Sequence, residues 1–141
     1  MKKPIFSWDP EDGSALCIIH DREKTYYGMA SCHPDEIDMM SEKTGCELAY
    51  MRACLMSLKS VREEFKAELK GLKKYYYSMN TSKWFNPEGY EARRLFSHMG
   101  LLEADIAALK TLIEEQNNNI QEFIKNKGEF YKKIRRNRER D

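Results

Sequence analysis

Residues 99–134 read MGLLEADIAALKTLIEEQNNNIQEFIKNKGEFYKKI, and they carry the strongest structural signal in the chain. Side chains recur there at alternating steps of three and four residues, and nine of the eleven positions in this seam are apolar. The seam consists of Met99, Leu102, Ile106, Leu109, Ile113, Gln116, Ile120, Phe123, Lys127, Phe130 and Ile134. This spacing predicts one long helix with a coiled-coil-like face. We expect it to begin at Asn86-Pro87, where asparagine caps and proline suits the first turn, and to end near Arg136.

A second helical pattern precedes this one. Between Cys46 and Met79 the apolar positions again recur at threes and fours, and Thr44 with Glu47 fits a capping box. These positions are Ala49, Ala53, Met56, Leu58, Val61, Phe65, Leu69, Leu72, Tyr76 and Met79. We expect a helix over 45–79 that pairs antiparallel with the long one through a turn at 80–86. That pairing aligns residue 45 with about residue 121.

Three short strands are predicted ahead of the helices. Ile5 to Trp8 forms an edge strand, and 9–13 has the Pro, Asp and Gly residues of a turn. Ala15 to His20 and Thr25 to Cys32 form a hairpin around the charged connection 21–24, which places His20 opposite Thr25 and Cys17 opposite Gly28. One face then carries Ala15, Cys17, Ile19, Tyr26, Gly28, Ala30 and Cys32, and the other carries Leu16, Ile18, His20, Tyr27 and Met29.

The first of these faces favours contact with a helix, because Gly28 and Ala30 are small enough for close approach. His33-Pro34 ends the third strand, and 35–40 is a loop or a single helical turn. The predicted fold is therefore α+β: a three-stranded antiparallel sheet packed on the start of a long helix, followed by an extended antiparallel helical hairpin. The corresponding divisions are a β-β-β-α module at 1–60, the hairpin at 61–136 and a basic tail at 137–141.

Composition excludes several functional classes. The chain has 24 Lys and Arg residues and 23 Asp and Glu residues, which gives a net charge of +1. Only a local concentration of charge can therefore indicate an anionic partner. No apolar run approaches the roughly 20 residues that a membrane span requires, and no signal-peptide stretch follows the start. We expect a cytoplasmic protein with no membrane association.

Cys17, Cys32, Cys46 and Cys54 lack paired spacing, so we expect reduced and largely buried thiols. The same spacing disfavours a zinc site, since Cys32 directly adjoins His33 and the last two cysteines lie eight residues apart. No cysteine has an oxyanion-donating glycine loop nearby. We therefore expect no metal, no cofactor and no catalytic residue.

Cations and aromatic rings converge around the predicted turn between the helices. Rings could stack on bases, and cations could bind phosphates, so the turn is a candidate ligand site. Its residues are Lys73, Lys74, Tyr75, Tyr77, Trp84, Phe85, Arg93 and Arg94. The simpler interpretation is that the tyrosines close the helix pair and the lysines remain solvated. The tail 132–141 has six cations and two anions, which also suits the C-terminal end of a helix.

The two helices differ in length by about 23 Å at 1.5 Å per residue, so the second must project past the start of the first. The projecting apolar residues are Phe123, Ile124, Phe130, Tyr131 and Ile134. They need a partner, either the chain's own sheet or another copy. We predict a homo-oligomer, most simply a two-fold dimer.

The string GMASCHPD at 28–35, followed by Ser41-Glu42, Gly45, Ala49 and Arg52-Ala53, resembles a group of small phage and prophage proteins of Gram-positive bacteria. Their N-terminal half is similar to the double-stranded RNA-binding domain. The resemblance covers about residues 4–60 and implies three antiparallel strands crossed by a helix. It implies no activity.

One departure bears on function. RNA-binding members of that fold class carry a lysine cluster at the start of the last helix, whereas this chain has GCELAY at 45–50, with a carboxylate at Glu47.

Two hypotheses for the function follow from the sequence. The first is a non-enzymatic phage accessory protein, a counter-defence factor that captures a host immune protein or sequesters a small nucleotide signal. The second is a nucleic-acid-binding protein that uses the aromatic hairpin tip and the basic tail.

Overall fold

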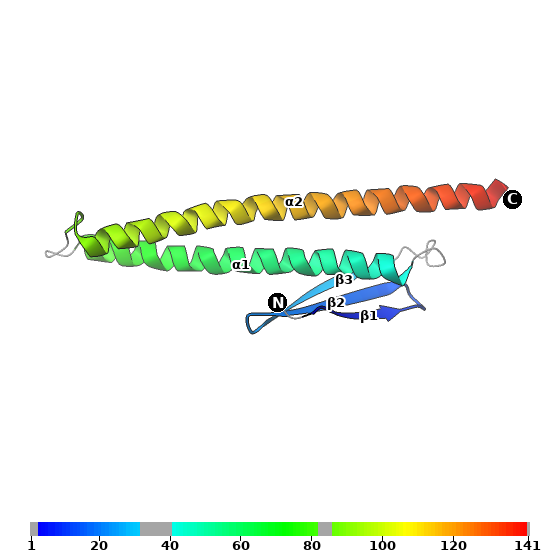
Figure 1. Ribbon diagram of the computed structural model, residues 1–141, viewed down its shortest axis with the longest axis horizontal. Coiled ribbons are helices and arrows are strands. Elements are labelled where there is room, and N and C mark those ends of the chain that lie inside the picture. Colours follow the sequence, from blue (N-terminus) through cyan, green and yellow to red (C-terminus); the bar gives the residue numbers. More distant parts are fainter. Residues whose placement is uncertain (1–2, 32–40, 82–85, 141) are drawn as a thin grey trace. The chain divides into compact units, whose positions relative to one another are not determined.

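The computed structural model describes residues 3–31, 41–81 and 86–140; the side chains of 131, 134, 135 and 138–140 lie outside that description. The elements are β1 (Ile5–Asp9), β2 (Ser14–Asp21), β3 (Lys24–Ala30), α1 (Glu42–Asn80) and α2 (Tyr90–Arg140). The α+β class is confirmed (Figure 1). In the described parts, neither helix has an apolar stretch that could cross a lipid bilayer.

The sheet is antiparallel in the order β1-β2-β3, and its predicted register is confirmed. His20 pairs with Thr25 and Cys17 with Gly28. The connection of β2 to β3 is shorter than the predicted 21–24, because Asp21 and Lys24 form a further pair. That leaves a two-residue turn of Arg22 and Glu23, whose φ angles of 49° and 64° follow the right-handed twist of a tight hairpin. The predicted third-strand end at Cys32 and the loop at 35–40 lie outside the described residues.

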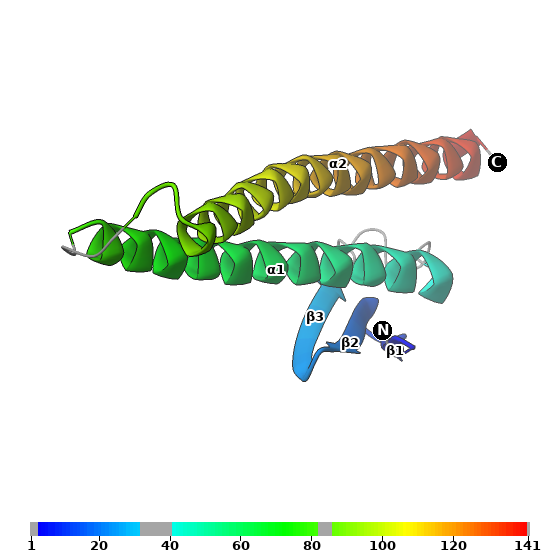
Figure 2. The ribbon, with the colours of Figure 1, turned by 60° about the vertical axis from the view of Figure 1, so that its left-hand side comes forward.

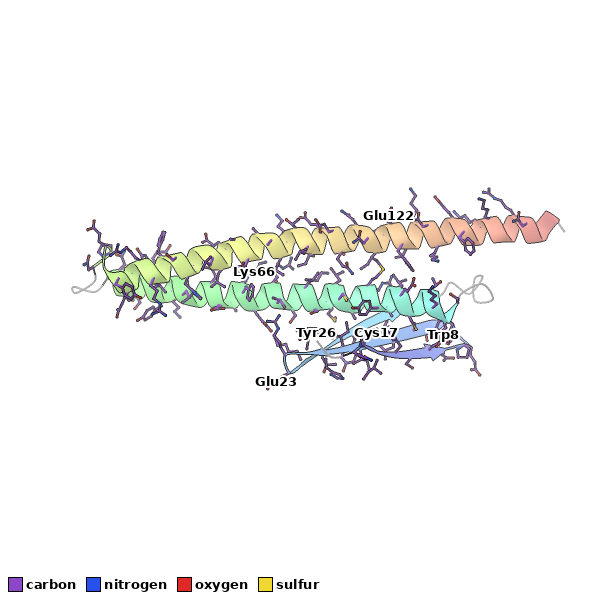
Figure 3. All side chains as sticks on the ribbon, viewed as in Figure 1. Trp8, Cys17, Glu23, Tyr26, Lys66 and Glu122 are labelled. Carbon is purple, nitrogen blue, oxygen red and sulfur yellow. The ribbon has the colours of Figure 1, made fainter. Side chains whose placement is uncertain are left out.

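The inner face of the sheet packs on the first turns of α1, as predicted (Figures 1 and 2). Gly28 makes the approach possible, since a Cβ there would overlap the Ala49 carbonyl oxygen and the Ala53 nitrogen. Cys17 and Tyr26 point from the sheet toward α1 (Figure 3). The buried cluster comprises Ala15, Cys17, Ile19, Tyr26, Ala30, Leu48, Ala49, Ala53 and Ile120.

Both helices begin away from their predicted first residues. The Oγ of Ser41 accepts a hydrogen bond from the Thr44 amide at 3.1 Å, so α1 is capped three residues earlier than the predicted Thr44. Asn86 caps only a turn, with its Oδ1 accepting from the Glu88 amide and its carbonyl from the Gly89 amide. The first i to i−4 bond of α2 runs from Arg93 to Gly89, so the helix starts at Tyr90.

The contacts divide the chain into two units: residues to Ser57 with those from Glu114, and Leu58 to Ile113. In unit 1 the side-chain amide of Gln116 donates to the Met51 carbonyl at 2.9 Å. This contact confirms the predicted antiparallel alignment of the helices within one residue. Ile120 joins the buried cluster, and Phe123 packs against it.

Unit 2 is a helical hairpin built on the predicted seam. Its buried residues are Ala92, Met99, Leu102 and Ile113, while Ile106 and Leu109 are half-buried. Across the pair, Nε2 of His98 lies 3.2 Å from Oε1 of Glu68. The seam prediction is therefore confirmed here. In unit 1 the seam prediction fails at Phe130, which is 55% exposed, and the apolar pattern predicted for the first helix fails at Met56, which is 51% exposed.

Gly28→Ala is expected to lower the free energy of unfolding by about 3 kcal/mol or more, because the added Cβ meets helix backbone that cannot rotate away. Urea denaturation would measure it. Gly71→Ala is the matched control: no atom lies within 4 Å of a Cβ there, and the change should stabilise α1 by up to about 1 kcal/mol. Equal effects of the two substitutions would contradict the close contact.

Candidate binding site

Unit 2 contains a groove of about 700 Å³ along one flank of the helical hairpin. Three of its large apolar lining side chains are strongly exposed: Tyr75 at 59%, Tyr90 at 73% and Leu101 at 66%. The complete lining is Leu72, Tyr75, Met79, Tyr90, Glu91, Arg94, Leu95, Ser97, His98 and Leu101. We call this the Tyr75 groove. Its volume lies within the range of small-ligand and peptide-anchor sites.

The charges in the Tyr75 groove are nearly balanced. Arg94 supplies one cation and Glu91 one carboxylate, three residues apart on the same helix. The His98 imidazole is hydrogen-bonded to Glu68, so its polar edge already has a partner. The groove is therefore apolar and aromatic in its lining, with no concentration of positive charge.

A second, smaller hollow of about 290 Å³ lies elsewhere on the hairpin. Lys73 and Glu103 line it, and their charged atoms lie 3.5 Å apart. The rings of Tyr76 and Phe96 meet there in a tilted contact with centroids 6.1 Å apart. The hollow is lined by Lys73, Tyr76, Tyr77, Phe96, Met99, Gly100 and Glu103. We call it the Lys73 hollow.

The structure divides the sequence-predicted ligand residues rather than gathering them. Tyr75 and Arg94 line the Tyr75 groove, whereas Lys73 and Tyr77 line the Lys73 hollow. Lys74 and Arg93 are exposed and line neither. Trp84 and Phe85 lie outside the described residues.

Several lining residues were not identified from the sequence as site residues. Leu72 and Met79 belong to the apolar pattern that predicts the first helix, and His98 falls outside both apolar patterns. Tyr90 and Leu101 carried a usable signal, because both are large apolar residues that fall outside the three-four seam. Large side chains off the seam of a paired helix mark exposed apolar surface.

The predicted oligomer residues occupy different environments in unit 1. Phe123 is half-buried against the chain's own core, and Lys127 lies 5.7 Å from its ring centroid. Ile124 and Phe130 are 38% and 55% exposed. The side chains of Tyr131 and Ile134 lie outside the description. Self-association through Ile124 and Phe130 stays a prediction.

Three cysteines gather where the sheet meets α1. Cys17 is fully buried, Cys46 and Cys54 pack around the same cluster, and all three thiols are free. Burial raises the pKa of the Cys17 thiol, and the neighbouring Cys54 and Cys46 raise it further. A hydrogen bond with Cys54 raises the pKa of the Tyr50 hydroxyl. Over the described part of the chain, no three His, Cys, Asp or Glu side chains are grouped as metal ligands.

The buried thiol makes folding sensitive to alkaline pH. Below about pH 9 both folded and unfolded chains keep the Cys17 proton, so stability does not change through this group. Above the ordinary pKa of 9.0 the unfolded chain releases the proton while the folded chain retains it. The free energy of unfolding should then fall by at most about 1.4 kcal/mol per pH unit.

Denaturation of the wild type and Cys17→Ala between pH 8 and 10.5 would measure this effect as a difference in slope. Cys17→Ala should show the shallower decline, although it is less stable at every pH because of the cavity. Gly71→Ala, far from the thiols in the sequence, should keep the wild-type slope. Parallel slopes for all three proteins would contradict the assignment to Cys17.

Comparison with known proteins yields no match to a family model, a curated protein or a solved structure.

Proposed function

We propose that this protein is a non-enzymatic binding protein whose Tyr75 groove captures an amphipathic helix of a partner protein. The observation that carries the proposal is the groove itself: exposed tyrosine and leucine side chains line it along the flank of a helix pair, with balanced charge. Grooves of this kind receive helices through apolar anchors spaced at three, four and seven residues.

The dimensions of the groove support a helix as its occupant. The lining from Tyr90 to Leu101 extends about 17 Å along α2, which is three helical turns. A partner helix of about 11 residues would cover that length and place three anchors in it. Glu91 and Arg94 in the lining would pair with a cation and a carboxylate on the partner.

A nucleotide is a weaker candidate for the same groove. A phosphate would meet one cation, Arg94, with the Glu91 carboxylate beside it. The other predicted phosphate ligands lie elsewhere, and Lys73 is already 3.5 Å from Glu103. Protein capture is therefore the better supported of the two binding modes.

The resemblance of about residues 4–60 to phage and prophage proteins supplies the biological context of the proposal. We propose a host immune protein in the bacterial cytoplasm as the partner. Its capture would make this chain a counter-defence factor.

Site-specific photo-crosslinking tests the groove. A photoreactive residue at position 90 or 101 should form one dominant adduct in host cells, and the crosslinked peptide should map to an amphipathic helix of the partner. The same residue at Lys110, exposed on α2 but outside the groove, is the control and should not give that adduct. Leu101→Arg should abolish the adduct formed at position 90.

Two outcomes would contradict capture of a helix. One is an adduct that forms equally from position 110. The other is the absence of any protein adduct together with a nucleotide recovered from purified wild type and lost from Arg94→Ala.

We also propose that copies associate through the projecting part of α2. Light scattering of the wild type should give a mass well above 16.7 kDa. Ile124→Asp with Phe130→Asp should return it to the monomer mass, since both side chains are exposed and neither belongs to the buried cluster. Tyr27→Asp with Met29→Asp, two exposed positions on β3, is the control. A monomeric wild type would refute the association.

A further inference from the structure

We propose that a basic stripe on the last third of α2 binds the phosphate backbone of duplex DNA. The stripe consists of Lys125, Lys132, Lys133 and Arg136, with Glu129 among them. All five side chains are exposed. Within the described residues, none of the four cations forms a salt bridge.

The stripe lies on a face that folding does not use. At about 100° per residue, Lys125, Lys132 and Arg136 share one side of the helix, while Phe123 lies about half a turn away. Phe123 packs against the core of unit 1. These three cations are therefore directed away from the packed side of α2, and Lys133 lies on the flank between them and that side.

The helix dipole does not account for Lys125 or Lys132. Its attraction for positive charge is confined to the last turn, and α2 continues to Arg140. Lys125 lies four turns before that end, and Lys132 more than two. The stripe instead places like charges at i and i+4, such as Lys132 and Arg136, which destabilises an isolated helix. An anionic partner would remove that repulsion.

The projecting helix suits duplex DNA among the polyanions. In unit 1 Gln116 of α2 lies opposite Met51 of α1. In this antiparallel alignment the first residue of α1, Glu42, lies alongside about residue 125 of α2 (Figure 1). Beyond it no described segment of α1 flanks α2. A single helix is about 10–12 Å wide and fits the major groove of B-form DNA, about 12 Å across, but not the narrow major groove of duplex RNA.

The number of phosphate contacts is limited by the neighbouring charges. Glu114, Glu115 and Glu122 precede the stripe on the same helix and would repel a backbone running along it. A duplex must therefore cross α2 at 125–136, a length of about 17 Å. Three to four contacts predict a salt slope of about −2.7 to −3.6, a loss of roughly 40- to 150-fold in affinity between 50 and 200 mM salt.

Fluorescence anisotropy with a labelled 20-base-pair duplex, titrated at several salt concentrations, tests the stripe. Lys132→Glu with Arg136→Glu should weaken binding at least about tenfold and reduce the slope by about 2. Lys59→Glu with Lys110→Glu changes the net charge equally at exposed positions of unit 2 and should retain most of the affinity. Circular dichroism would verify that both variants keep their helix content.

Three results would overturn the proposal. Equal losses in both double variants would mean that only net charge matters. Equal affinity for single strands, duplex RNA or vesicles containing phosphatidylserine would remove the assignment to duplex DNA. A salt-sensitive rise in mass without DNA, lost in the stripe variant, would show that the stripe binds the acidic segment of another copy.

Discussion

The close contact of β3 with α1 at Gly28 is the constraint on which unit 1 depends. Because the helix carries alanine at positions 49 and 53, backbone approaches backbone with no side chain between them. That distance brings Cys17, Ile19 and Tyr26 into one buried cluster. Arg52 adds a hydrogen bond of 2.7 Å to the Met29 carbonyl, which fixes the end of β3 against the same helix. Gln116 of α2 donates a hydrogen bond to the carbonyl of Met51 on α1, which ties the second helix to the first within unit 1.

The sequence contained enough information for most of this fold. The charged connection at 21–24 predicted the strand register, and a one-residue slip would expose Cys17 and Ile19. The ends of the helices were harder to predict, because Ser41 and Thr44 are both hydroxyl residues ahead of α1 and only geometry shows which one caps. The prediction that Asn86 caps the second helix was wrong for a similar reason. Its side chain accepts a hydrogen bond within a turn, and α2 begins only after that turn.

The residues that line the candidate site were harder to predict than the fold, because of the geometry of the α-helix. Tyr75, Tyr76 and Tyr77 are consecutive, so their side chains leave α1 about 100° apart and cannot all face one ligand. Tyr75 accordingly lines the Tyr75 groove, while Tyr76 and Tyr77 line the Lys73 hollow. Because these tyrosines are close in sequence, they were predicted to form one site, but consecutive side chains on a helix point in different directions. Residues of α2, 15 or more positions along the chain, complete the lining of the Tyr75 groove and of the Lys73 hollow.

The last third of α2 differs energetically from the rest of the helix. From Met99 to Phe123 its seam side chains are buried or half-buried, so packing supports the helical conformation, whereas Phe130 is exposed. Local pairing then carries more of the stability there, and Glu129 four residues before Lys133 has the favourable order for such a pair. The like-charged pair of Lys132 and Arg136, also four residues apart, opposes helix formation. A partner that neutralised the stripe would remove the repulsion between Lys132 and Arg136, so the proposed binding would also stabilise this end of α2.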